Sequence, residues 1–289
     1  MRRVHFFEFH DQPWFPSSLR DYVTDALQFG FNLLKSYAPI APLLQSALDS
    51  AGNGPNAGRS VIDMCSGGGG PWFDLSRRLQ IGTRGGRALP ADGAEPRHHA
   101  SGSAGLQVWL TDKYPNLKAF QSARAASENR IAFYPESVDA TKVPRELKGL
   151  RTMFTSFHHF SPDDARAILQ DAVDAGESIA IFEVPRRAWS TISLTFAFVF
   201  MLFIGTPWVR PFRWSRLLWT YLVPILPLVL LFDGVVSCLR TYRPRELREM
   251  VEKLSANEYQ WEMGEQPSGK VPITFLIGYP GASSREFVR

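Results

Sequence analysis

Short apolar runs alternate with stretches of helical periodicity between residues 58 and 187. The apolar runs are SVIDMC, LQVWLTD, IAFYPESVDA, LRTMFTSFHHF and SIAIFEV, and each has a length typical of a buried strand. Between them PWFDLSRRLQ, PNLKAFQSARAAS and SPDDARAILQDAVDAG have helical spacing, and Ser161 is predicted to cap the last of these helices. This alternation predicts an α/β fold with a doubly wound, mainly parallel sheet that helices cover on both faces.

The two ends of the chain add further elements to this sheet. After residue 241 the helix PRELREMVEKLS precedes two strand-like runs, EYQWEMGEQ and ITFLIGY, and the lack of a helix between them predicts an antiparallel pair at the edge. Residues 17–50 have helical spacing, with Ser17 or Ser18 as the N-cap, and prolines divide them into two helices. We therefore predict an N-terminal helical cap over 1–57, a core formed by 58–187 and 241–289, and an insertion over 188–240.

The insertion over 188–240 contains the two most apolar runs of the chain. The first, AWSTISLTFAFVFMLFIGTPWV, has no charged residue and as a helix would be roughly 33 Å long, about the thickness of a bilayer core. The second, LLWTYLVPILPLVLLF, is also uncharged, but its two prolines predict a kink. Together they predict a hydrophobic helical hairpin, which could dip into one leaflet, span the bilayer twice, or form a lid on a soluble protein.

Positive charge is concentrated around this insertion. The chain carries a net charge of +4, but the segment from Arg186 to Arg248 contains nine arginines and only two acids, Asp233 and Glu246. Arginines flank the hairpin on both sides, which disfavours two spans and places all of them at one headgroup surface if the hairpin is shallow. Two cysteines give no disulfide framework and fit a reducing compartment. We therefore expect attachment to an anionic membrane surface on the cytoplasmic side, and no binding to nucleic acid.

Four consecutive glycines, Gly67 to Gly70, follow the first predicted strand. Because glycine in regular structure costs about 0.5–1 kcal/mol relative to alanine, four in a row indicate a sharp turn that a ligand approaches closely. The run VIDMCSGGGG resembles the first motif of class I S-adenosylmethionine-dependent methyltransferases, an apolar pair and an acid followed by G-x-G-x-G. Asp63 takes the acid position, Gly67 and Gly69 take the second and third glycine positions, and Cys65 stands where the first glycine usually lies.

The resemblance implies a Rossmann-like fold with S-adenosyl-L-methionine bound at the carboxyl ends of the strands. Asp112, after the second strand, would accept hydrogen bonds from the ribose hydroxyls, and Asp139 would contact the adenine amino group. The implied cofactor-binding residues are Asp63, Cys65, Ser66, Gly67, Gly69, Asp112, Lys113, Asp139, Ala140 and Ser156.

Each of these residues has a plainer alternative role. The glycines could form only a tight turn, Asp112 could cap the next helix, Asp139 could be a turn acid, and Cys65 could serve packing alone. A nicotinamide site on the same fold would need G-x-G-x-x-G, which the glycine run does not provide. The motif order therefore favours the methyltransferase.

Three residues could remove a proton from the methyl acceptor. His158 and His159 follow the fourth strand, and strand alternation would direct them to opposite faces, so at most one should reach the acceptor. Glu183 ends the fifth strand and is the competing base. The histidines could instead pack in the core or cap the helix at Ser161. No metal site is expected.

In the fold that the resemblance implies, the chain after the fifth strand borders the acceptor pocket. The apolar insertion therefore suggests a membrane-associated methyltransferase, a transferase acting on an amphiphilic or lipid-like small molecule. A small polar acceptor with a merely anchoring insertion, and a cofactor-binding protein without turnover, remain open. Aromatic and basic residues of the opening segment (Trp14, Phe15, Arg20 and Tyr22) would help to cover the cofactor.

Overall fold

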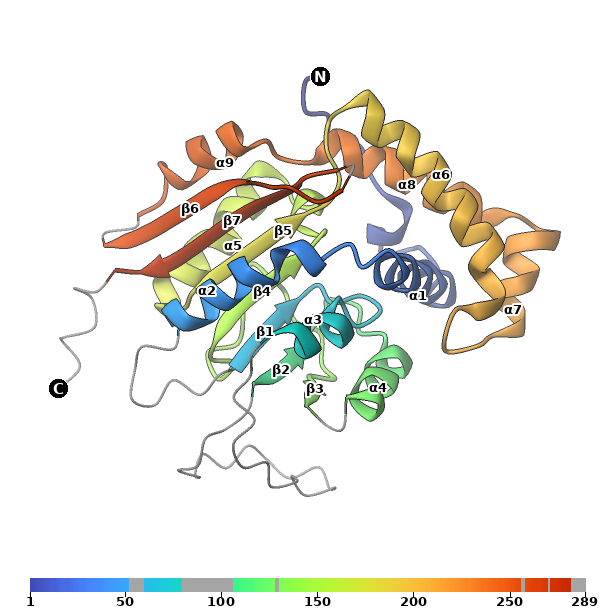
Figure 1. The fold of residues 1–289 in the computed structure, drawn as a ribbon, viewed down its shortest axis with the longest axis horizontal. Coiled ribbons are helices and arrows are strands. Elements are labelled where there is room, and N and C mark those ends of the chain that lie inside the picture. The colour runs from blue at the N-terminus through green and yellow to red at the C-terminus, as the bar shows by residue number, and fades with distance from the viewer. Residues whose placement is uncertain (52–59, 80–105, 128–129, 256–257, 270, 282–289) are drawn as a thin grey trace.

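The computed structural model describes residues 1–51, 60–79, 106–127, 130–255, 258–269 and 271–281 (Figure 1). Its described strands form one mixed sheet of seven, in the order β3-β2-β1-β4-β5-β7-β6. They are β1 (Ser60–Met64), β2 (Gln107–Leu110), β3 (Ile131–Phe133), β4 (Leu150–Phe154), β5 (Ile179–Glu183), β6 (Tyr259–Gln266) and β7 (Ile273–Pro280).

Strands β1 to β5 pair in parallel, whereas β7 is antiparallel to both β5 and β6. The predicted Rossmann-like sheet, mainly parallel with an antiparallel terminal pair, is therefore confirmed. Strand order reverses at β1, whose neighbours are β2 and β4. In such sheets, ligands bind outside the carboxyl ends of the strands at this point.

Helices cover both faces of the sheet (Figure 1). The α-helices are α1 (Ser17–Leu33), α2 (Ala41–Ala51), α3 (Trp72–Arg78), α4 (Leu117–Ala126), α5 (Pro162–Ala175), α6 (Trp189–Gly205), α7 (Trp214–Leu217), α8 (Ile225–Arg240) and α9 (Pro244–Val251). Leu44 of α2, Leu75 of α3 and Phe120 of α4 belong to one buried cluster. Ile168 of α5 and Leu247 of α9 belong to the cluster on the other face. These five helices thus bury an apolar side against the sheet.

Two local predictions fail and one succeeds. The Ser161 hydroxyl accepts a hydrogen bond from the backbone N–H of Asp164, so the predicted cap of α5 is confirmed. Helix α1 begins at Ser17 itself, after Pro16, so neither predicted serine cap forms. Strand β4 ends at Phe154, because Thr155 has a φ of 48° and turns the chain into the 3₁₀ helix η3 (Phe157–His159).

The insertion forms a lobe with α1 beside the sheet (Figure 1). Helix α6 is followed by the 3₁₀ turn η4 (Thr206–Trp208), α7, the π-helix η5 (Leu218–Leu222) and α8, and α7 with η5 meets α8 at 76°. Helices α6 and α8 pack on each other and on α1, and their shared interior contains Val23, Val199, Leu202 and Leu230. The insertion is therefore the predicted helical hairpin, with one side buried against the N-terminal helix.

Candidate active site

A cavity of about 1080 Å³ lies between the carboxyl ends of the parallel strands and the lobe. Its sheet side is lined by Cys65, Ser66, Gly67, Asp112, Lys113, Asp139 and Ser156. Its lobe side is lined by apolar residues of α1, α6 and α8, among them Leu27, Phe31, Leu194, Phe198, Met201 and Leu230. One space therefore joins the predicted cofactor edge to an apolar chamber. Asp63, Gly69 and Ala140, which the motif also predicted, lie outside its lining.

The glycine loop adopts backbone conformations that side chains disfavour. The φ angles are 54° at Gly67, 111° at Gly69 and 64° at Gly70, all in the region that favours glycine. A Cβ at Gly68 would lie 2.7 Å from the Thr24 carbonyl oxygen of α1, and one at Gly69 would lie 2.9 Å from Gln28 Nε2. The loop is thus a tight turn on which α1 packs closely. Gly69 serves this contact with α1 and does not face the cavity.

Cys65 keeps the backbone of the glycine that it replaces in the motif. Its φ is 56°, a conformation that costs a non-glycine residue about 1–2 kcal/mol. Burial raises the pKa of the Cys65 thiol well above its ordinary value, so the thiol stays protonated. These features favour the packing role for Cys65 over a nucleophilic one.

Asp63 holds the glycine loop from behind. Ser66 Oγ donates to Asp63 Oδ2 at 2.7 Å, and Thr152 Oγ1 of β4 donates to Asp63 Oδ1 at 2.8 Å. A Cβ at Gly70 would lie 2.8 Å from Asp63 Oδ2, which explains why Gly70 must be glycine. Burial raises the pKa of Asp63 to about 7, although the hydrogen bonds from Ser66 and Thr152 act to lower it. Asp63 therefore positions the loop from outside the cavity lining, and its contact with a cofactor stays a prediction.

Asp112 joins the end of β2 to the glycine loop. The backbone N–H of Gly67 donates to Asp112 Oδ2 and that of Tyr114 to Asp112 Oδ1, both at 2.8 Å. A carboxylate accepts about four hydrogen bonds, so both oxygens retain acceptor capacity towards the cavity. Burial raises the pKa of Asp112. Helix α4 is capped by Asn116, whose side chain accepts from the Ala119 N–H, so Asp112 is not the helix cap.

The remaining predicted residues lie around the same opening. Asp139 is exposed and accepts hydrogen bonds from the backbone and hydroxyl of Thr141, as a turn acid would, and it also lines the cavity. Lys113 Nζ lies 3.7 Å from Asp139 Oδ2. Ser156 is buried against the cavity, and its Oγ has no hydrogen-bond partner among the described residues. That hydroxyl and the free acceptor capacity of Asp112 are polar groups suited to a bound ligand.

The two predicted histidines do not point to opposite faces. Both lie on η3, and their ring centroids are 4.2 Å apart. Glu183 accepts the backbone N–H groups of Ser156 and Phe157, and its Oε2 lies 2.5 Å from His158 Nδ1. Glu183 therefore orients His158; its oxygens are engaged and it does not line the cavity, so the geometry favours His158 over Glu183 as the base.

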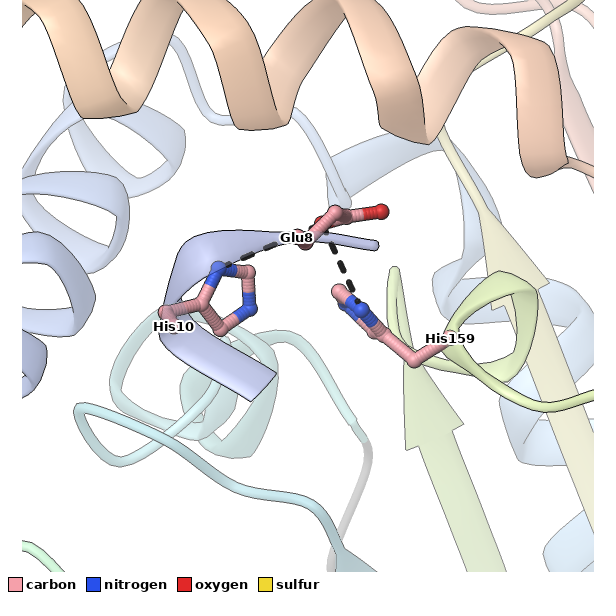
Figure 2. Close-up of side chains that lie close together, drawn as sticks. All are labelled: Glu8, His10 and His159. Atoms are coloured by element: carbon pink, nitrogen blue, oxygen red, sulfur yellow. Dashed lines mark ion pairs between the residues drawn. The ribbon is translucent and has the colours of Figure 1, made fainter. Parts of the chain in front are cut away.

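Sequence reasoning missed a charged cluster that faces the histidines, made of Glu8, His10, Asp11, Asp233 and Arg240. Asp233 of α8 accepts from His10 Nδ1 at 2.8 Å, and Asp11 Oδ2 lies 3.1 Å from His159 Nδ1. Arg240 Nη1 lies 3.2 Å from Glu8 Oε1 and 3.0 Å from Asp11 Oδ2. Figure 2 shows Glu8 and His10 of the N-terminal segment close to His159 of η3. Two signals in the sequence were available. The first is the Glu-x-His-Asp pattern, which phenylalanines flank, and the second is Asp233, an acid at the end of an apolar run.

Strong electrostatic effects act inside this cluster. Burial alone would lower the pKa of His10, but the hydrogen bond to Asp233 and the charges of Asp11 and Glu8 raise it to about 9. Burial raises the pKa of Glu8, which is 0% exposed. The cluster is held in place by Arg20, which donates to the carbonyl oxygens of His10 and Gln12. Of the predicted residues of the opening segment, Arg20 lines the cavity, Trp14 is exposed, and Phe15 and Tyr22 are core residues; cover of the cofactor by this segment stays a prediction.

The arginines around the hairpin are largely paired within the protein. Arg216 is 2% exposed and bonds Asp25 of α1, and Arg213 lies 3.5 Å from Asp21. Ion pairs also join Arg186 to Glu265, Arg187 to Glu246, and Arg240 to Glu8 and Asp11. Of these arginines, Arg213, Arg216 and Arg240 connect the insertion to the N-terminal residues, so their guanidinium groups are engaged within the protein.

No protein-family model matches the chain, nor does any curated protein sequence. Solved structures with a similar fold include magnesium protoporphyrin IX methyltransferase from Synechocystis, which has S-adenosylmethionine bound (TM-score 0.48, 10% identity, covering 96% of this chain and 100% of that one). The plantazolicin methyltransferase BpumL, in complex with S-adenosylhomocysteine, has a TM-score of 0.49 and 9% identity, over 91% of this chain and 96% of that one. A provisionally assigned O-methyltransferase from Nostoc punctiforme has a TM-score of 0.45 and 12% identity; 87% of this chain spans 59% of that one.

These likenesses are too weak to identify a reaction or a substrate. The strand order and the antiparallel β7 define the fold as Rossmann-like.

Proposed function

We propose that this protein transfers a methyl group from S-adenosyl-L-methionine to a largely apolar acceptor. The observation that carries the proposal is the single cavity, which has the glycine loop and Asp112 on one side and the apolar chamber of α1, α6 and α8 on the other. A cofactor at the sheet side and an acceptor in the chamber would meet beside η3. When bound, S-adenosylmethionine supplies an electrophilic methyl group on a positively charged sulfur.

Residues of the sheet side fit this cofactor. Asp112 has acceptor capacity left for two ribose hydroxyls, and Asp139 offers a carboxylate oxygen near the surface, where Lys113 is its neighbour. Gly67 and Ser66 leave room for a ligand at the start of the loop, and the Ser156 hydroxyl is without a partner among the described residues. The protein's contribution is mainly to orient the two reactants.

His158 is the group best placed to accept a proton from the acceptor. Glu183 fixes its Nδ1, and its Nε2 has no hydrogen-bond partner among the described residues, although the ring is buried and borders the cavity. A carboxylate that orients an imidazole while its other nitrogen faces the substrate is a recurring arrangement for a general base. Replacing His158 by alanine should lower turnover about 100-fold or more and leave cofactor affinity intact.

The outer surface of the lobe suits a membrane. Large apolar side chains are exposed on it, namely Trp189, Phe196, Phe200, Ile204, Trp208, Trp214, Leu222 and Leu228. Soluble monomers seldom expose an apolar patch of this extent. The stretch Trp189–Trp208 is also long and apolar enough to cross a bilayer. Two complete spans would remove Asp233, Arg216 and Arg240 from their buried partners, so we favour a hairpin that lies in one leaflet of a membrane on its cytoplasmic side.

The test uses the full-length protein with methyl-labelled S-adenosylmethionine and a membrane lipid extract. We expect label in the organic phase and micromolar binding of the cofactor by calorimetry. Label found only in water-soluble products would support the alternative of a small polar acceptor with a merely anchoring insertion. Binding without transfer to any extract would indicate a cofactor-binding protein, and absence of binding would refute the proposal.

A further inference from the structure

Two imidazoles and one carboxylate converge at the polar end of the cavity. Glu8 precedes the 3₁₀ helix η1 (Phe9–Asp11), which carries His10, and His159 ends η3 on the opposite wall (Figure 2). Glu8 Oε2 lies 3.4 Å from His159 Nδ1 and 3.9 Å from His10 Nδ1. One potential ligand atom from each of the three residues lies within 4.8 Å of the others. Two ligands at ordinary bond lengths of about 2.0–2.2 Å from one ion lie at most about 4.4 Å apart, and both separations from Glu8 Oε2 meet this limit.

Glu8 is the buried member of this group. It is 0% exposed, and its Oε1 has no hydrogen-bond partner among the described residues, although Arg240 Nη1 is 3.2 Å away. His158 Nε2, 3.9 Å from that oxygen, is also buried without a partner. Buried carboxylates are normally paired or bound to a metal, because removing them from water is costly. Arg240 compensates the charge of Glu8 at Oε1, and a cation bound at Oε2 would compensate the acids that Arg240 shares with it.

The charges around the three residues favour a cation. Glu8, Asp11, Asp233 and Glu183 are carboxylates of this region, and Arg240 is the guanidinium among them. Asp233 and Asp11 contact the imidazoles of His10 and His159 directly, at 2.8 and 3.1 Å. These contacts are made by the Nδ1 atoms, so a cation bound at the same nitrogens would replace a proton there and lie beside both carboxylates. A divalent cation would offset most of the excess negative charge.

We propose that Glu8, His10 and His159 bind a divalent transition-metal cation at the polar end of the cavity. Imidazole ligands suit zinc, iron, cobalt or nickel, whereas magnesium and calcium prefer oxygen ligands alone. His10 and His159 line the cavity, so the bound cation would keep a position open towards it. An acceptor oxygen could bind there, which extends the proposed function, but binding of the cation itself does not depend on methyl transfer. The expectation of no metal site is thereby reversed in this proposal.

The test measures binding of cobalt(II) and zinc(II) alone, without cofactor, to tag-free full-length protein stripped with a chelator. The protein carries H98Q and H99Q, which removes two histidines outside the described residues. We expect one equivalent of cobalt(II), with visible absorption bands that zinc(II) abolishes by displacement. Because loss of an outer partner already weakens metal sites about 10–100-fold, E8Q, H10Q and H159Q should each weaken binding by at least about 100-fold.

His5→Gln is the matched control, because His5 is an exposed histidine of the same N-terminal segment and lies outside the group. Its affinity for cobalt(II) should equal that of the parent. Thermal unfolding of each variant shows whether it is folded. If one ligand variant fails to fold, the comparison uses the other two. The proposal is overturned if the parent binds no cobalt(II) or zinc(II), or if folded H10Q and H159Q proteins bind as tightly as the parent. Failure of S-adenosylmethionine binding would leave this result unaffected.

Discussion

Polar groups on the sheet side of the cavity are held by neighbours in the sheet and its loops, whereas those on the lobe side are held by distant partners. Asp63 bonds Ser66, three positions away, and Asp112 bonds the backbone of Tyr114, two positions away. On the lobe side, His10 bonds Asp233 across 223 positions and Arg216 bonds Asp25 across 191. The sheet side is thus formed within the α/β core, where the bond from Thr152 to Asp63 crosses 89 positions, whereas the lobe side exists only when the N-terminal segment and the insertion dock.

This contrast predicts that the outer face of the lobe, and not its arginines, governs membrane attachment. Phe200 and Trp208 are 65% and 62% exposed on that face. Since burying a large apolar side chain is worth about 1.5–3 kcal/mol, the double variant F200S/W208S should bind vesicles at least about 100-fold more weakly. Sedimentation with neutral phosphatidylcholine vesicles measures this.

Leu117 of α4 is the control for that experiment, because it is an exposed apolar residue far from the insertion in sequence. Leu117→Ser should leave sedimentation unchanged. Because most arginines are paired internally, added salt should have little effect on binding. Binding to anionic vesicles alone, with release in salt, would support attachment through the arginines. No binding to any vesicle would mean that the lobe is a lid on a soluble protein.

The second prediction concerns the buried ion pair between Asp25 and Arg216, which connects the lobe to α1. Asp25→Ala leaves Arg216 buried without its carboxylate, and breaking a buried pair in this way costs about 3–5 kcal/mol. The free energy of unfolding from urea titration should fall by that amount. The double variant D25L/R216M, which removes both charges, should recover most of the loss. If the single variant were as stable as the parent, the ion pair would not hold the lobe.

Sequence patterns revealed the sheet side far better than the lobe side. Strand and helix periodicity are local signals, so the seven strands followed from them, and the resemblance carried by the glycine run then singled out Asp112 and Ser156 after the strands. Pairing between Glu8 and Arg240 depends on how α8 returns to the N-terminal segment, which no short window of sequence contains. The error about His158 and His159 has a local cause, since the positive φ of Thr155 ends the strand before them.

The third prediction compares two acids of the sheet side. Asp112 is half-buried and bonds the glycine loop, whereas Asp139 is exposed and bonds only its own turn and Lys113. Losing charged hydrogen bonds costs about 1.5–3 kcal/mol, so Asp112→Ala should weaken S-adenosylmethionine binding at least about tenfold. Asp139→Ala should cost less, because water competes at that site. Calorimetry that ranks the two variants in the opposite order would move the ribose contact away from Asp112.

The smallest effect is expected from the acid behind the loop. Burial raises the pKa of Asp63 to about 7 in the folded protein, above its ordinary value of 3.8. A raised pKa means that the folded state holds the proton more tightly, so this stabilisation is complete below pH 4 and is lost as pH rises through 7. Asp63→Asn has no such titration and can still bond Ser66 and Thr152. The stability of the parent relative to D63N should therefore fall by about 1.5 kcal/mol between pH 5.5 and 7. Urea titrations at both pH values measure this difference. The control is Asp163→Asn, at an exposed position of α5, which should show no such difference. A difference that grows with pH would mean that Asp63 is ionised throughout and that its two hydroxyl donors outweigh burial.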